Sequence, residues 1–189
     1  WKHPLSFQRH PEKIDYPAAH SLNIDQSRLF YLPDRELPLV DLIFLVKSGS
    51  VDVAESKIGL TQLLNGSLLR GGTENYSPAE LARVLDENAI HISISVGEED
   101  TVIHLSVLKE DWQMGLDLLQ EILLRPGFDP GVLEIVKTQA LTGLKRQGGN
   151  AQAVAGRERE IWQFKGHPYG RDPLAGLKTI PAITGDDLK

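Results

Sequence analysis

The stretch GLTQLLNGSLLRGGT, residues 59–73, decides the fold of this chain. It carries no charged side chain between Lys57 and Arg70, although charged residues make up 24% of the sequence. At helical spacing, four leucines share one side, Leu60, Leu63, Leu64 and Leu68. The opposite side carries Gln62, Asn65 and Gly66. Because a helix with no charged face is normally buried nearly all round, we predict that these three residues face an interior surface or cavity.

The spacing of Gln62, Asn65 and Gly66 matches a zinc motif in position but not in chemistry. Inverted zinc peptidases carry H-x-x-E-H on such a helix: two histidines bind Zn²⁺, and the Glu takes a proton from the metal-bound water. A carboxamide is a poor zinc ligand, glycine has no side chain, and Asn65 cannot accept a proton as a carboxylate does. Spacing alone therefore favours a core helix with two amides on one face.

Four segments in order resemble the pitrilysin/insulinase/mitochondrial-processing-peptidase family over nearly the whole chain. They are VKSGSVDVAESKIGLTQLL, LLRGGTENYSPAEL, VLKEDWQMGLDLLQEILLRPGFDP and GHPYGRDPL. The resemblance implies the fold of these zinc metallopeptidases, with a third ligand, a Glu, on a later helix. That position falls on or next to Gly143, and the nearest acid, Glu134, lies more than two helical turns away. We therefore expect the peptidase fold without its metal site and without a cofactor of its own.

Composition bounds the class of protein. With 189 residues, 41% of them hydrophobic, the chain can bury a core, and we expect one principal domain. A net charge of −6 argues against a general nucleic-acid surface, no apolar run is long enough to cross a bilayer, and the lack of cysteine excludes disulfides and thiolate metal sites. The sequence leaves the compartment open. Because it begins at Trp1 rather than Met, a removed export signal, with a periplasmic or otherwise exported location, stays open as an expectation.

The order of predicted elements gives the fold class. Pro4, Pro11 and Pro17 predict an extended arm over residues 1–27, and residues 28–189 a single domain cut short at its C-terminal end. Ser77, Pro78 and Glu80 predict a capping box, and Trp112, Leu116, Leu119 and Leu123 an inward helix face. We expect strands at 28–32, 38–46, 90–96 and 101–108. We expect a central helix within 59–73 that stops at Gly71-Gly72-Thr73, a second helix that begins at Pro78, and further helices at 111–124, 130–147 and 151–164. The fold class is α+β, an antiparallel sheet with helices packed on one face.

The strand at 90–96 is the candidate for peptide contact. In active relatives the corresponding strand is an edge that binds extended peptide by strand addition. An Asn-Ala pair usual there stands here as Ser93-Ile94, followed by Ser95, so the peptide-contact residues are predicted with an altered pair. His91 and His104 fall on one face of the predicted hairpin, but no third ligand accompanies them, and two surface histidines are favoured over a metal site.

Three functions fit these observations. The first is a non-catalytic homologue, the zinc-free half of a clamshell peptidase whose zinc-bearing half is a homologous domain or subunit. The second is a structural or assembly protein that kept the fold without peptide handling. The third is a metallopeptidase that uses other ligands, which the four positions Gln62, Asn65, Gly66 and Gly143 disfavour.

Overall fold

The computed structural model describes residues 16–189, and the chain divides into two compact units, Trp1–Pro38 and Leu39–Lys189. In the first unit, β1 (His20–Ile24) pairs antiparallel with β2 (Ser27–Tyr31), and all ten strand residues are exposed. A strand near residues 28–32 was predicted, but β1 lies inside the predicted arm, where no regular element was expected. The proline spacing misled because Pro17 precedes β1 and interrupts nothing in it. Residues 1–15 of the predicted arm lie outside the described residues.

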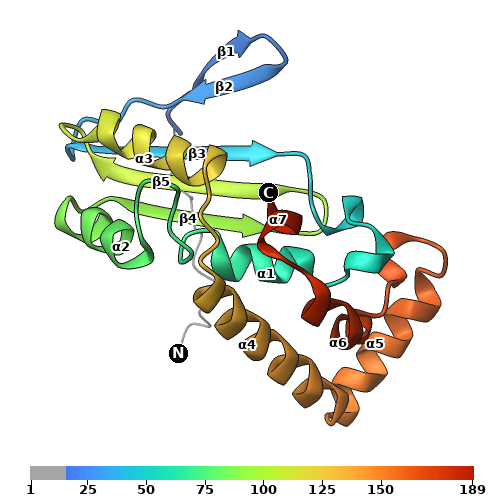
Figure 1. The fold of residues 1–189 in the computed structure, drawn as a ribbon. Helices are drawn as coiled ribbons and strands as arrows, with labels where there is room; N and C mark the ends of the chain where they lie inside the picture. The colour runs from blue at the N-terminus through green and yellow to red at the C-terminus, as the bar shows by residue number, and fades with distance from the viewer. Residues whose placement is uncertain (1–15) are drawn as a thin grey trace, which may run out of the picture. The chain divides into compact units, whose positions relative to one another are not determined.

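The second unit contains an antiparallel sheet in the order β3-β5-β4 (Figure 1). Its strands are β3 (Leu39–Val46), β4 (His91–Val96) and β5 (Thr101–Leu108). The register aligns Leu42, Leu105 and Ile92 in one row across the three strands. Leu105 and Ile92 are buried, whereas the neighbouring strand positions His104 and Ser93 lie on the opposite face. The alternation predicted for β4 and β5 is confirmed, since period-two patterning places every second side chain in the core.

Five longer helices follow the predicted order: α1 (Leu60–Ser67), α2 (Pro78–Glu87), α3 (Trp112–Leu124), α4 (Pro130–Gly148) and α5 (Ala151–Gln163). Two short ones close the chain, α6 (Gly176–Thr179) and α7 (Gly185–Leu188). The capping box before α2 is confirmed: the Ser77 N–H donates to Glu80 at 2.9 Å, and the Glu80 N–H donates to the Ser77 hydroxyl. The first turn of α5 is capped by the Asn150 carboxamide oxygen, which accepts from the Ala153 N–H at 3.0 Å.

The inward face of α3 agrees with the predicted one only in part: Leu119 is buried as expected, and Leu116 is partly buried against the core. The buried residues are Gly115, Leu118, Leu119 and Ile122. Trp112 and Leu123, which were expected inside, are 45% and 36% exposed. Gly115 explains the rotation: a Cβ there would lie 3.3 Å from Leu105 Cδ1, so the helix approaches β5 along its smallest residue. Asp111 precedes α3, but its side chain makes no capping hydrogen bond.

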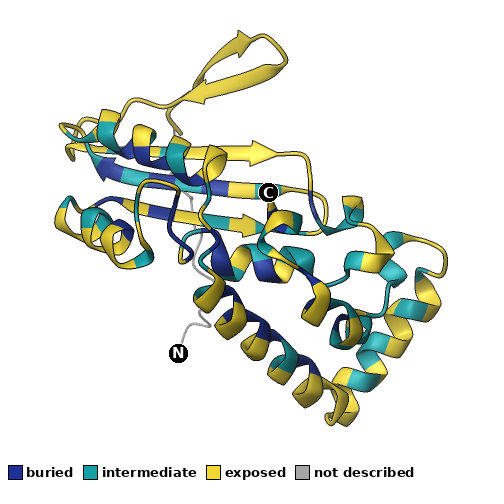
Figure 2. Ribbon diagram, viewed as in Figure 1, coloured by how far each residue is buried: buried dark blue, intermediate teal, exposed yellow. Residues whose placement is uncertain are grey.

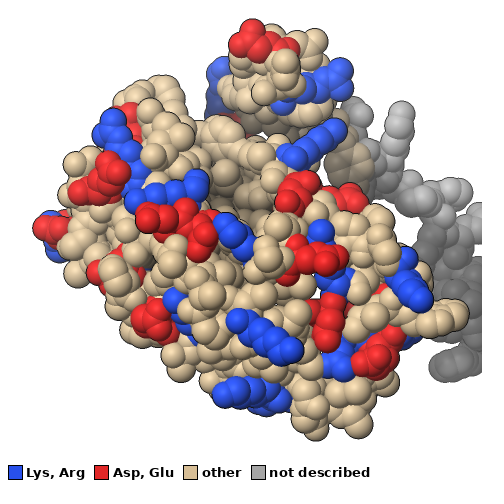
Figure 3. Space-filling view, turned by 45° about the vertical axis from the view of Figure 1, so that its right-hand side comes forward, with Lys and Arg blue, Asp and Glu red and all other residues tan. Residues whose placement is uncertain are grey.

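Burial concentrates between the helices and one face of the sheet (Figure 2). Leu63 of α1, Leu105 of β5 and Ile122 of α3 are fully buried there, so the α+β class with helices on one face is confirmed. β3 is the exception, with Ile43 72% and Leu45 63% exposed. Acidic and basic side chains alternate over the face drawn in Figure 3 rather than gathering by sign. Among residues 16–189, no helix has the combination of length and apolar character needed to span a membrane.

Candidate functional site

The helix that carries the degenerate motif is anchored at its first residue. Gly59 precedes α1 with φ of 96°, a left-handed conformation that glycine adopts without strain. A Cβ at Gly59 would also lie 2.5 Å from Ile180 Cγ1. The Thr179 hydroxyl donates to the Ile58 carbonyl just before the helix. The start of α1 is therefore fixed against the segment around α6, far away in the sequence.

The polar face of α1 is exposed, which corrects the expectation of an interior surface. Gln62 and Asn65 are exposed, while Leu63 and Ser67 are fully buried. The hydroxyl of Ser67 donates to the Leu63 carbonyl at 2.6 Å, so its burial leaves no unpaired polar group. A helix without charges was expected to be buried all round, but α1 has only eight residues and reaches the core along one side.

Asn65 makes a two-point contact with the end of β4. Its Nδ2 donates to the Val96 carbonyl at 3.1 Å, and its Oδ1 accepts from the Val96 N–H at 2.7 Å. Both backbone polar groups of one residue, Val96, are thus satisfied by one carboxamide. The position that holds the general base in the H-x-x-E-H motif here ties α1 to the sheet.

Gly66 and Gly143 occupy opposite environments on α1 and α4. A Cβ at Gly66 would lie 2.5 Å from Val136 Cγ1, a distance that real Cβ contacts do not show, so α1 and α4 approach each other at this glycine. A Cβ at Gly143 would meet nothing within 4 Å. A histidine at position 66 therefore requires Val136 to move, whereas position 143 has space for a larger side chain.

The described residues bring no metal-ligand set together. Among residues 16–189, no group of three His, Cys, Asp or Glu side chains is placed to hold a metal ion. His91 and His104 do lie on the same face of the sheet, with ring centroids 6.5 Å apart. His104 Nε2 lies 3.2 Å from Asp41 Oδ1, and hydrogen bonds from Ser106 and His104 lower the pKa of Asp41. The pair therefore belongs to a polar row on the outer face of the sheet.

The predicted peptide-contact residues lie on an edge strand. β4 is the last strand of its sheet in the described part of the chain, so its far side is unpaired there. Ser93 and Ser95 are exposed on the outer face, and Ile94 is half-buried on the helix face. The edge position is the geometry that strand addition requires. Contact with a peptide stays a prediction.

Two side chains of the segment HPYGR make tertiary contacts, one to the loop before α1 and one to the β4–β5 turn, and motif spacing gave no sign of them. Arg171 Nη1 donates to the Val53 carbonyl at 2.7 Å and to the Ser50 carbonyl at 3.2 Å. The Tyr169 hydroxyl donates to Glu99 in the β4–β5 turn, and that hydrogen bond raises the pKa of Tyr169 to about 12. The segment was recognised only through the family resemblance.

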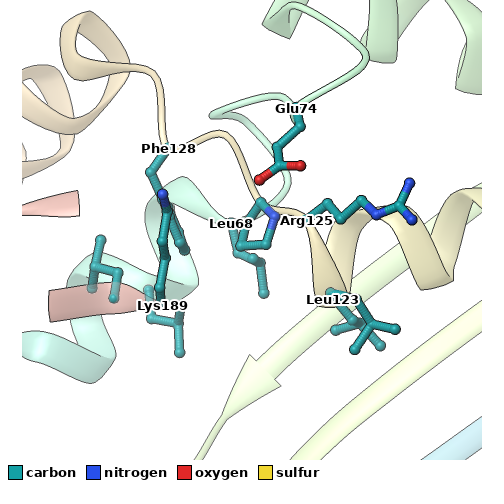
Figure 4. Close-up of a pocket in the computed structure, with 10 residues that line it drawn as sticks. Leu68, Glu74, Leu123, Arg125, Phe128 and Lys189 are labelled. Atoms are coloured by element: carbon teal, nitrogen blue, oxygen red, sulfur yellow. The ribbon is translucent and has the colours of Figure 1, made fainter. Parts of the chain in front are cut away.

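Two hollows lie beside α1. The larger, of about 330 Å³, is mostly apolar and extends beneath the ends of the three strands of the second unit. Its lining includes Val46, Leu60, Leu64, Ile94, Val96 and Ile103. The second, of about 260 Å³, is lined by Leu68, Leu123 and Phe128 and bordered by Glu74 and Arg125 (Figure 4). Leu64, Leu68 and Leu123 line both, so the hollows adjoin, and neither contains a catalytic constellation.

Fold and site together define a peptidase-like α+β domain whose motif positions carry no zinc ligand. The family model described as Insulinase (Peptidase family M16) matches residues 34–172, so the chain belongs to peptidase family M16. Among curated proteins, it is 27% identical over 168 residues to the non-peptidase homolog YmxG of Helicobacter pylori, covering 88% of this chain and 39% of that protein. It is 25% identical over 118 residues to the mitochondrial-processing peptidase subunit beta of Saccharomyces cerevisiae, covering 62% of this chain and 26% of that subunit.

Two solved structures share the fold. A peptidase M16 inactive domain from Pseudomonas fluorescens superposes with a TM-score of 0.80 at 23% identity, over 90% of this chain and 42% of that chain. The periplasmic protease PqqL from Escherichia coli superposes with a TM-score of 0.75 at 16% identity, over all of this chain and 21% of that chain. The chain thus spans about two fifths or less of these relatives. Together with the missing ligands on α1, the comparisons support a non-catalytic member of the family.

Proposed function

We propose that this chain is the zinc-free half of a two-domain peptidase and pairs with a homologous zinc-bearing domain or subunit. The observation that carries the proposal is that residues at the motif positions make contacts that hold the fold together. Asn65 binds the backbone N–H and C=O groups of Val96, and the missing side chain of Gly66 leaves space for Val136. Residues with these contacts stabilise the fold and leave metal binding to another domain. The names of the relatives, a non-peptidase homolog and an inactive domain, agree with this role.

The role of this half is to shape the chamber and to hold substrate in an extended form. Of the predicted contact residues Ser93, Ile94 and Ser95 on the edge strand β4, Ile94 turns its backbone N–H and C=O groups toward such a peptide, and the two serines flank it on the outer face. Backbone pairing is insensitive to sequence, so it suits a half that holds substrate without cutting it. Zinc, the only cofactor required, belongs to the partner.

Co-expression with the zinc-bearing homologue from the same source tests the pairing. We expect a one-to-one complex by light scattering, zinc bound by the partner, and peptide cleavage that depends on both chains. Purification of each chain alone is the control. Lack of a complex would refute the proposal, and capture of a protein unrelated to peptidases would favour the structural or assembly role. Near-stoichiometric zinc on this chain alone, with chelator-sensitive cleavage, would instead identify a metallopeptidase with other ligands.

A further inference from the structure

The hydrogen-bond pattern of β4 shows which of its backbone groups are free. The Gly97 N–H donates to the Asp100 carbonyl at 2.7 Å, so these residues form a hydrogen-bonded pair at the turn. In an antiparallel ladder, such pairs alternate with pairs whose backbone groups point outward. Ile92, Ile94 and Val96 therefore turn their N–H and C=O groups away from β5, toward the unpaired edge.

One of these three outward-facing residues already has a partner. The Asn65 carboxamide accepts from the Val96 N–H at 2.7 Å and donates to the Val96 carbonyl at 3.1 Å. A carboxamide has the same donor and acceptor as a peptide unit, so this contact reproduces the two hydrogen bonds that an added strand would make there. Asn65 lies on α1, which begins and ends far from β4 in sequence.

We propose that Asn65 is an edge cap, a positioning residue that closes the β4 edge at Val96 and confines an added peptide to Ile92 and Ile94. The occupant is an extended peptide segment, because the open groups are backbone donors and acceptors at strand spacing. This inference rests on the proposed capture of an extended peptide by β4. It goes further by fixing where the bound segment ends: the added strand cannot continue past Ile94, because Asn65 of α1 already binds both backbone groups of the next outward-facing residue, Val96.

The cap limits how strongly the β4 edge can bind a peptide. Two open residues provide up to four backbone hydrogen bonds, and each contributes only modestly against water. Capture by β4 alone is therefore weak, and a second domain that contributes further contacts raises the affinity. The outer-face neighbours Ser93 and Ser95 are small and exposed, so they leave the approach to the edge unobstructed.

Residue-resolved amide hydrogen exchange tests the cap in the full chain. In the unsubstituted protein, we expect the Val96 amide to be protected and the Ile92 and Ile94 amides to exchange rapidly. Asn65→Ala speeds exchange at Val96 by about tenfold or more, because the Val96 N–H loses its acceptor and the Val96 carbonyl loses its donor. Gln62→Ala is the matched control, since Gln62 is an exposed carboxamide on the same helix. Asn65→Leu has a similar size and neither donor nor acceptor, so it provides a second variant with the same expected exchange at Val96 if Asn65→Ala unfolds.

An acetylated and amidated Thr-Val-Thr-Val-Thr-Val peptide serves as the probe for strand addition. We expect it to slow exchange at Ile92 and Ile94 in the unsubstituted protein, and also at Val96 in Asn65→Ala. The cap is refuted if Asn65→Ala leaves Val96 exchange unchanged, or if the probe protects all three residues equally in both proteins. If Val96 responds to Asn65→Ala but the probe protects no residue in either protein, the cap stands as a contact, and peptide capture by β4 is refuted.

Discussion

Gly66 and Gly143 offer a matched test of the packing that replaces the metal site. Alanine at position 66 places a methyl group 2.5 Å from Val136 Cγ1, whereas alanine at position 143 meets no atom within 4 Å. Both glycines lie within helices, so both substitutions gain about 0.5–1 kcal/mol from backbone entropy. Only Gly66→Ala also overpacks a buried contact, at a cost of about 1–3 kcal/mol.

The two variants should therefore shift stability in different directions. Gly143→Ala stabilises by about 0.5–1 kcal/mol. For Gly66→Ala the overpacking exceeds the entropy gain, and the expected result is a net loss of up to about 2 kcal/mol. The separation between the variants, about 1–3 kcal/mol, corresponds to roughly 2–12 °C in Tm for a chain of this size.

Urea and thermal unfolding followed by circular dichroism measure this separation. Val136→Ala supplies the second half of a double-mutant cycle, because it removes the methyl groups that the new Cβ would strike. In the Val136→Ala background, Gly66→Ala should become neutral or stabilising. Equal stabilisation by Gly66→Ala and Gly143→Ala in the unsubstituted background would show that α1 and α4 do not approach each other closely at Gly66.

Three further predictions concern one helix cap, one side-chain hydrogen bond and one ion pair. Ser77→Ala should cost about 1 kcal/mol in urea unfolding, because the α2 capping box is lost, and no change would exclude the box. The hydrogen bond to Glu99 raises the pKa of Tyr169 to about 12, above the ordinary tyrosine value of about 10. This contact should therefore stabilise the folded protein below pH about 10, and the stabilisation should be lost as the pH rises from about 10 to about 12. Glu99→Gln should bring that pKa down in an ultraviolet titration, and an unchanged titration would contradict the contact. Hydrogen bonds from Lys57 and Thr184 lower the pKa of Asp187, so stability should fall as pH drops below about 4, and Lys57→Met should flatten this fall.

Local signals in the sequence predicted most elements of the second unit. The Ser77 and Asn150 caps act within one helical turn, and the β4–β5 alternation depends only on the strand period, so neighbouring residues suffice to encode them. Local signals were insufficient where tertiary packing determines which face of a helix is buried. The buried face of α3 follows Gly115 rather than the larger apolar side chains, because closeness to Leu105 and Val107 decides it.

The sequence by itself determined what this chain lacks: the types of residue at positions 62, 65, 66 and 143 exclude the motif ligands, whatever the fold. Only the tertiary structure decided what those positions do instead. Asn65 meets Val96 across 31 residues of chain, and Gly66 meets Val136 on another helix. Such contacts follow from how α1 lies against β4 and α4, and no short-range pattern records that placement, because its energy comes from pairs that are close only after folding.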